Sequence, residues 1–257
     1  LSVVGNTHIN GSTVTTTGKA QSYNGTVTLG DDTTLTATTL TLVNAVTGSH
    51  DLTVVGNTVM NGSTVTTTGK AQNYSGTIAL GADTTLNATS LTLGNAVTGA
   101  YDLTVVGNTV MNGGTVTTTG KAQNYSGTIA LGADTILTAA NIMIGNAVTG
   151  AHDFRIVGNT VLNGGTVNTT GKAQSYSGTV TLGADTALTG ATVTLMGNVS
   201  GDHDLSVTGG MTFGGATLNT GTHTQTYAND FSFGQDATLT ASRIYFMAGV
   251  DLSLIHI

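Results

Sequence analysis

The sequence contains no cysteine, no proline and no glutamate, and only six of its 257 residues are Lys or Arg. Without cysteine the chain has no disulfide and no thiolate metal site. Without proline its turns must rest on Gly, Asn and Asp, which tolerate positive φ. The net charge is −7. Because phosphate binding needs a basic stripe, nucleic acid is excluded as a partner.

Long apolar runs are also missing. No stretch approaches the ~20 residues of a membrane helix, so we expect no membrane insertion. The abundant residues are Thr, with 55 copies, and Gly, with 37. Helices favour Glu, Lys, Arg and Ala, whereas Thr, Val and Ile suit strands. The composition therefore predicts an all-β fold.

A unit of 51 residues fills the chain. Its five copies cover residues 1–51, 52–102, 103–153, 154–204 and 205–251. The tyrosines recur in strict register, at Tyr23, Tyr74, Tyr125, Tyr176 and Tyr227. A fixed period of this length indicates stacked repeats rather than one globular core. We therefore expect residues 1–251 to form a single parallel β-solenoid array.

Apolar and polar residues alternate within each unit, as in a strand with one buried face. Leu91 and Leu93 are replaced only by apolar residues in the other copies, while Thr92 varies to Met143 and Tyr245. This predicts that Leu91 and Leu93 are buried and Thr92 is exposed. Internal similarity favours two coils per unit, each of roughly 25 residues, and three coils of about 17 residues stay open as an alternative.

The repeat breaks after Asp251. The hexapeptide at residues 252–257, Leu-Ser-Leu-Ile-His-Ile, resembles the translation of a transposon-derived sequencing adaptor. We interpret it as a non-native tail and set it apart from the fold. Because Leu1 stands in repeat phase, we expect the chain to be a piece of a longer polypeptide, with uncapped ends that self-associate end to end.

The motif Gly-x-x-Gln-x-Tyr-x-Gly-x-Val-x-Leu-Gly-Ala-Asp-Thr-x-Leu spans Gly171 to Leu188. It recurs with Ile in place of Val from Gly69 to Leu86 and from Gly120 to Leu137. These segments resemble the repeats of filamentous-haemagglutinin-type adhesins and related exported repeat proteins. The resemblance implies a right-handed parallel β-helix on a bacterial outer surface or secreted from the cell. It supplies no binding-site motif.

We therefore expect a structural stalk of a bacterial adhesin, which spaces or displays a binding region. Its partners would be a host or neighbouring cell surface, or carbohydrate, contacted through regions outside this chain. The alternative is a solenoid whose lateral face itself binds carbohydrate, ice or another surface. A polysaccharide-degrading β-helix enzyme is the third hypothesis.

The best candidate for chemistry is a repeated His-Asp pair. It occurs at His50-Asp51, His152-Asp153 and His203-Asp204, with Tyr101-Asp102 in the second copy. Copies two coils apart would place equivalent imidazoles roughly 10 Å from one another. Zinc ligands lie within about 2.0–2.2 Å of one ion, so the copies cannot share a metal. We interpret the pair as a turn in which Asp bonds its own backbone.

The remaining candidates have structural interpretations as well. Asp202 joins His203 and Asp204 in the densest polar cluster, which lacks a basic neighbour for an acidic sugar. The Gly-Ala-Asp-Thr turns lack the close spacing of a calcium repeat, and Thr-x-Thr occurs too rarely for an ice-binding face. The turn aspartates are Asp32, Asp83, Asp134 and Asp185, and the lysines Lys19, Lys70, Lys121 and Lys172 fit a solvated edge. We expect no catalytic, cofactor-binding or metal-binding residues and no enzymatic activity.

Overall fold

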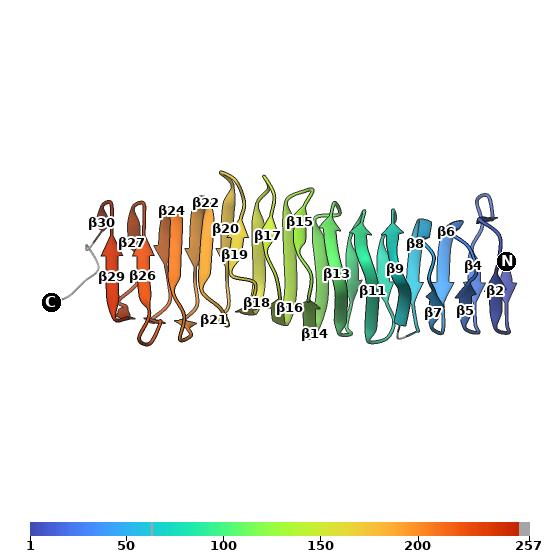
Figure 1. Ribbon diagram of the computed structural model, residues 1–257, viewed down its shortest axis with the longest axis horizontal. Coiled ribbons are helices and arrows are strands. Elements are labelled where there is room, and N and C mark those ends of the chain that lie inside the picture. The colour runs from blue at the N-terminus through green and yellow to red at the C-terminus, as the bar shows by residue number, and fades with distance from the viewer. Residues whose placement is uncertain (63, 252–257) are drawn as a thin grey trace. The chain divides into compact units, whose positions relative to one another are not determined.

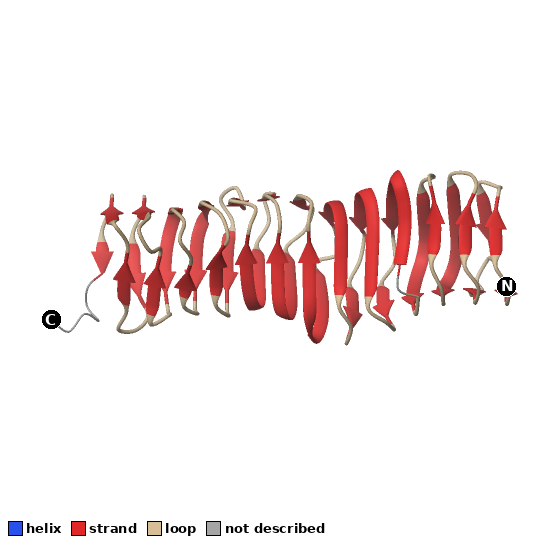
Figure 2. Cartoon of the chain, turned by 60° about the horizontal axis from the view of Figure 1, so that its bottom comes forward, coloured by secondary structure: helices blue, strands red, loops and turns tan. Residues whose placement is uncertain are grey.

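A computed structural model describes residues 1–62 and 64–251. The described residues form strands and turns, without a helix (Figure 2). Accordingly, none of them belongs to a helix long and apolar enough to cross a membrane. The tail predicted at residues 252–257 lies outside the described residues.

The chain forms two compact units, Leu1–Gly127 and Thr128–Ile257, and the interpretation of residues 1–251 as a single array stays a prediction. Within each unit the strands pair in parallel with strands of the preceding and following turns (Figure 1). Paired residues are 18 to 21 positions apart, as for Leu91 with Thr109 and for Val65 with Leu86. The chain comprises about 13 turns of roughly 19 residues. The predicted all-β parallel solenoid is thereby confirmed.

Three stacks of strands build the first unit. Stack 1 holds β1 (Ser2–Val3), β4 (Gln21–Tyr23), the second halves of β6 (Thr33–Leu42) and β8 (Leu52–Met60), β10 (Ile78–Leu80), β12 (Val97–Gly99) and the first half of β14 (Thr115–Tyr125). Stack 2 holds β2 (Thr7–Ile9), β5 (Val27–Leu29), β7 (Val46–Gly48), the first halves of β9 (Thr64–Tyr74), β11 (Thr84–Leu93) and β13 (Leu103–Met111), and the second half of β14. Stack 3 holds β3 (Thr13–Thr15), the first halves of β6 and β8, and the second halves of β9, β11 and β13.

The second unit repeats this plan. Stack 4 holds β15 (Ile129–Leu131), β17 (Val148–Thr149), β19 (Thr166–Asn168), the first halves of β22 (Thr186–Leu195) and β24 (Leu205–Phe213), β26 (Thr224–Tyr227) and β29 (Arg243–Phe246). Stack 5 holds the first halves of β16 (Thr135–Ile144) and β18 (Phe154–Leu162), β20 (Ala173–Tyr176), the second halves of β22 and β24, β27 (Phe231–Phe233) and β30 (Val250–Asp251). Stack 6 holds the second halves of β16 and β18, β21 (Val180–Leu182), β23 (Val199–Ser200), β25 (Thr217–Asn219) and β28 (Thr238–Thr240).

The prediction of two coils per 51-residue copy is wrong, and so is the alternative of three coils per copy. Each 51-residue copy contributes eight strand segments, and three segments complete a turn, so one copy spans two and two-thirds turns. Each copy therefore begins in the stack next to the one in which the preceding copy begins. Tyr23 lies in stack 1, Tyr74 in stack 3 and Tyr125 in stack 2. Residues that are equivalent in sequence thus face in different directions.

The core follows the predicted alternation. Leu91 and Leu93 are 0% and 2% exposed, and Thr92 between them is partly exposed. Burying such aliphatic side chains contributes about 1.5–3 kcal/mol each relative to leaving them in water. In the last described turn the pattern weakens, since Phe246 is 38% exposed although it packs against Tyr227 with ring centroids 5.2 Å apart.

Glycine allows the long strands to bend from one stack to the next. Gly107 in the middle of β13 has φ of 114°, which side-chain-bearing residues rarely adopt. A Cβ there would also collide with the carbonyl oxygen of Ala88 in the preceding turn. Both constraints also hold at the equivalent Gly56, Gly158 and Gly209, whereas Gly5 in the first turn has neither.

Candidate functional site

The polar corners between stacks gather most of the ionisable side chains. The carboxylate of Asp134 accepts a hydrogen bond from the Asp153 backbone N–H (3.0 Å), and Asp153 accepts one from the Ala173 N–H (2.9 Å). Each aspartate thus connects its own turn to the next one. The same ladder runs from Asp32 to Asp51 to Ala71, from Asp83 to Asp102 to Ala122, and from Asp185 to Asp204 to Thr224.

This geometry corrects one detail of the sequence interpretation. The aspartates of the His-Asp pairs do have a structural role, but they bond the backbone of the following turn rather than their own. The repeat does not reveal these partners, because the spacing between bonded residues is not constant from turn to turn. Satisfying a backbone N–H with a carboxylate gives a charge-assisted bond, which is stronger than a neutral one.

Each corner histidine lies beside the aspartate of the preceding turn, not beside its neighbour in sequence. Nδ1 of His50 is 3.6 Å from Asp32 Oδ1, Nδ1 of His152 is 3.4 Å from Asp134 Oδ1, and Nδ1 of His203 is 3.5 Å from Asp185 Oδ1. The structure therefore joins the His-Asp pairs to the Gly-Ala-Asp-Thr turns, which the sequence treats as separate motifs. The side chains of these histidines remain 35–37% exposed.

The aspartates that accept these contacts have lowered pKa values. The hydrogen bond from the Asp153 N–H is the main cause for the pKa of Asp134, and the Asp204 N–H acts in the same way on the pKa of Asp185. The neighbouring histidines lower both pKa values further. These carboxylates consequently stay ionised at neutral pH, which suits turn-to-turn bonding rather than proton donation.

The predicted row of equally spaced imidazoles does not exist. His152 precedes β18 in stack 5, whereas His203 precedes β24 in stack 4, so the two stand at different corners of the same unit. The lysines follow the same rule: Lys19 precedes stack 1, Lys70 lies before the stack 3 half of β9, and Lys121 lies before the stack 2 half of β14. All are exposed, as predicted for solvated residues, but they form no single edge.

One corner differs from the others in its side chains, and it was not predicted from the sequence. His223 takes the place that lysine has in the other copies, and its Nδ1 is 3.1 Å from Asp202 Oδ1. It lies one turn beyond His203, with ring centroids 6.0 Å apart and planes inclined by 39°. Asp202 also accepts a hydrogen bond from the Thr222 N–H, which is the main cause of its lowered pKa. The signal was available as a Lys-to-His change between copies.

The repeated tyrosines serve the interior. Tyr74 is 0% exposed, and its hydroxyl donates to Gln72 Oε1 (3.1 Å). Gln72 Nε2 donates in turn to the carbonyl oxygens of Val65 (2.9 Å) and Asn87 (3.0 Å). Burial raises the pKa of Tyr74 well above its ordinary value. The Gln-x-Tyr motif thus satisfies buried polar groups of the core and supplies no outward aromatic row.

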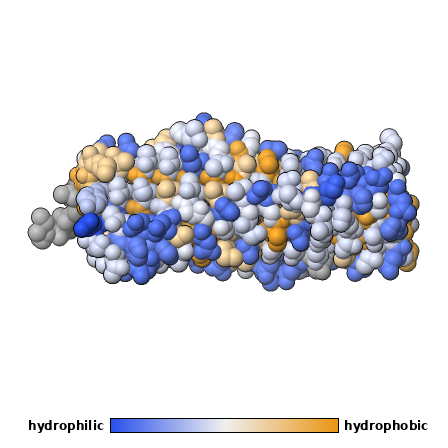
Figure 3. All heavy atoms as spheres, viewed as in Figure 1, coloured by the Kyte–Doolittle hydropathy of each residue, from blue (hydrophilic) through white to orange (hydrophobic). Residues whose placement is uncertain are grey.

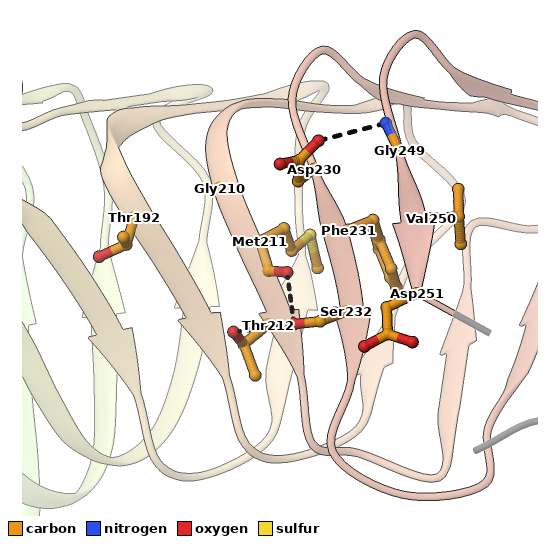
Figure 4. Close-up of a pocket in the computed structure, with 10 residues that line it drawn as sticks. All are labelled: Thr192, Gly210, Met211, Thr212, Asp230, Phe231, Ser232, Gly249, Val250 and Asp251. Carbon is orange, nitrogen blue, oxygen red and sulfur yellow. Dashed lines mark hydrogen bonds between the residues drawn. The ribbon is translucent and has the colours of Figure 1, made fainter. Parts of the chain in front are cut away.

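The surface of the described residues carries shallow, open grooves. A groove of ≈ 450 Å³ crosses stack 5, lined by Met211, Phe231 and Val250 among others (Figure 4). Its Asp230 carboxylate accepts from the Gly249 N–H (3.2 Å), and Ser232 Oγ donates to the Met211 carbonyl (3.2 Å). On the face shown in Figure 3, apolar residues lie in scattered groups between hydrophilic ones.

The threonine pairs do not continue from turn to turn. Thr13 and Thr15 of β3 lie beside Thr34 and Thr36 of β6, but the next turn presents Thr53 and Val55.

No protein-family model matches the chain, and neither a curated protein nor a solved structure matches it. Among the described residues, no three His or Asp side chains converge on one metal position.

Proposed function

We propose that this solenoid is a structural spacer, the repeat region of a large exported bacterial adhesin that displays a binding region elsewhere in the polypeptide. The observation that carries the proposal is the mismatch between the 51-residue copy and the turn of roughly 19 residues. Because each copy begins in a different stack from the copy before it, identical surface residues are distributed over the three stacks of a unit. Repetition therefore extends the solenoid without building a continuous row of one residue type on one face.

The constant parts of the copies support the same conclusion. They are the core alternation, the buried Gln-x-Tyr network, in which Gln72 donates to the Asn87 carbonyl of the next turn, and the aspartate ladders, which bond one turn to the next. Tandem units that interact mainly with their neighbours can be added or removed with little effect on the rest. Such an array suits a segment whose required property is length. The resemblance of its repeats to those of filamentous-haemagglutinin-type adhesins favours secretion to the bacterial outer surface.

The test is direct binding by the purified chain. We expect no retention on immobilised glycans or on host cells, and no effect on ice growth, at concentrations up to about 100 μM, which corresponds to a binding free energy weaker than about 5.5 kcal/mol. The positive control is the complete adhesin to which we propose that the solenoid belongs, which should adhere to its target surface. Saturable binding by the isolated solenoid would instead assign recognition to its lateral face.

A further inference from the structure

We propose that His203 and His223 form a two-imidazole binding site for a divalent transition-metal ion such as Ni²⁺, Cu²⁺ or Zn²⁺. The two side chains stand at the corner that precedes stack 4, on successive turns of the second unit. This site departs from the sequence expectation of no metal-binding residues. It depends on a contact between turns that the repeat register conceals.

The spacing of the rings fits one shared ion. Imidazole nitrogens bind Zn²⁺ at about 2.0–2.1 Å, which places the centroids of two rings on one ion roughly 5–6 Å apart. The observed separation is 6.0 Å, with the ring planes inclined by 39°. Both side chains are about one-third exposed, so small rotations about their side-chain bonds can bring the nitrogens to the ion.

The carboxylates at this corner leave the correct nitrogen available. Nδ1 of His223 faces Asp202 Oδ1 at 3.1 Å, and Nδ1 of His203 faces Asp185 Oδ1 at 3.5 Å. A neutral imidazole that donates Nδ1–H to a carboxylate carries its lone pair on Nε2, which is the form that binds metals. Carboxylate–histidine–metal arrangements of this kind are common, because the carboxylate orients the ring and makes it more basic.

The surrounding carboxylates favour a cation, and the imidazole ligands determine which cations bind. Asp202 and Asp185 each place a carboxylate oxygen beside one of the two imidazoles, 3.1 Å and 3.5 Å from Nδ1. Imidazole suits Ni²⁺, Cu²⁺ and Zn²⁺, whereas Mg²⁺ and Ca²⁺ prefer oxygen ligands. Because no third protein ligand converges on the described pair, water would complete the coordination. The site would therefore be an open, surface chelate.

The other copies provide matched controls. At the equivalent corner of the second unit, His152 lies 3.4 Å from Asp134, but Lys172 and Ala151 occupy the positions that His223 and Asp202 occupy 51 residues later. The backbone is the same at both places: the Lys172 N–H donates to Thr169 O (3.1 Å) and the His223 N–H donates to Thr220 O (3.0 Å). His223→Lys therefore restores a residue that this fold already accepts.

The experiment is a Ni²⁺ titration followed by calorimetry and by paramagnetic broadening of the imidazole NMR signals. All samples carry His256→Ala, which removes an imidazole outside the described residues. We expect one equivalent of Ni²⁺ to broaden the His203 and His223 signals first. His223→Lys should weaken binding at least about tenfold, and Asp202→Asn should weaken it by about tenfold or more. His152→Ala should leave it unchanged.

The converse experiment transplants the site. Ala151→Asp combined with Lys172→His should create a second equivalent of Ni²⁺ bound through His152 and the new imidazole. Equal affinity of the parent chain and His223→Lys would overturn the proposal, as would equal losses in His152→Ala and His223→Lys. Circular dichroism of each variant distinguishes loss of the site from loss of the fold. His223→Lys, Ala151→Asp and Lys172→His use residues found at equivalent corners, so these variants should keep the fold.

Discussion

At the residue scale, two observations decide which side chains matter for stability. A side chain that points inward meets equivalent inward residues of the turns on either side, whereas its outward neighbours meet water. Copy-to-copy variation is sufficient to separate these classes, because Leu91 and Leu93 stay apolar while Thr92 changes. The buried polar residues could not be recognised in this way. Gln72 and Tyr74 are as constant as any core leucine, but their roles follow from bonds to Val65 and Asn87 that only the fold brings close.

The matched pair Leu93→Asp and Thr92→Asp tests the inward–outward assignment. Leu93→Asp should lower the free energy of unfolding by several kcal/mol, since it leaves an unpaired charge in the core. Thr92→Asp should change it by within about 0.5 kcal/mol, as is usual for surface substitutions. Urea unfolding followed by circular dichroism measures both. Equal losses in the two variants would contradict the assignment.

At the element scale, aspartates at the corners bond one turn to the next. The sequence identifies these residues as turn formers, and that much is correct. It does not identify their partners, because the spacing of paired residues varies between 18 and 21 and so never appears as a period. The histidine contacts could not be predicted from the sequence for the same reason. His152 and Asp134 belong to successive turns and lie in motifs that look independent.

Acid should weaken these corners. Asp134 has a folded-state pKa below its ordinary value, mainly because it accepts the Asp153 N–H. A carboxylate with a depressed folded pKa stabilises the protein above its unfolded pKa of about 3.9, and this stabilisation is lost as pH falls through the folded value. We therefore expect stability to fall below about pH 4. In Asp134→Asn the fall should be smaller, because the side chain no longer titrates.

Melting temperatures between pH 2 and pH 5, for the parent chain and Asp134→Asn, measure this difference. Repeating the series at about 0.5 M salt separates the causes. A local hydrogen bond persists at that ionic strength, whereas attraction from exposed charges is largely screened. An identical acid response of the two proteins would show that the Asp134 contact contributes nothing to the fold.

At the scale of the whole molecule, the fold class could be predicted and the number of turns could not. Period-two alternation, Gly and Asn bends and a strict repeat indicate a solenoid wherever they occur together. The turn is hidden because each copy holds eight strand segments, which three-sided turns cannot divide evenly. Looking for two coils in one copy compares segments that belong to different stacks. Comparing every third segment would have shown the turn of roughly 19 residues.

The mismatch between copy and turn also determines how the array can be shortened. Deleting the second copy, Leu52–Asp102, joins Asp51 to Leu103, and Leu103 then occupies the position that Leu52 has in stack 3. Neighbouring turns meet equivalent residues as before, so the fold should survive with the loss of one copy's share of stability. The solenoid should shorten by two and two-thirds turns, roughly 13 Å. Everything beyond the deletion should also turn by one stack.

Spin labels at Ser22 and Thr117 measure that rotation, since both side chains lie in stack 1 and are partly exposed. Deleting residues 78–96 is the control, because it removes one complete turn from Ile78 to the residue before its partner Val97. In the control Thr117 should stay in stack 1 and the label distance should shorten by one strand spacing, about 4.8 Å. Deletion of Leu52–Asp102 should instead move Thr117 to stack 2, which adds a lateral offset to the shortened axial distance. If the two deletions changed the distance only in proportion to the turns removed, copies would not rotate between stacks, and a lateral row of equivalent residues would again be available for binding.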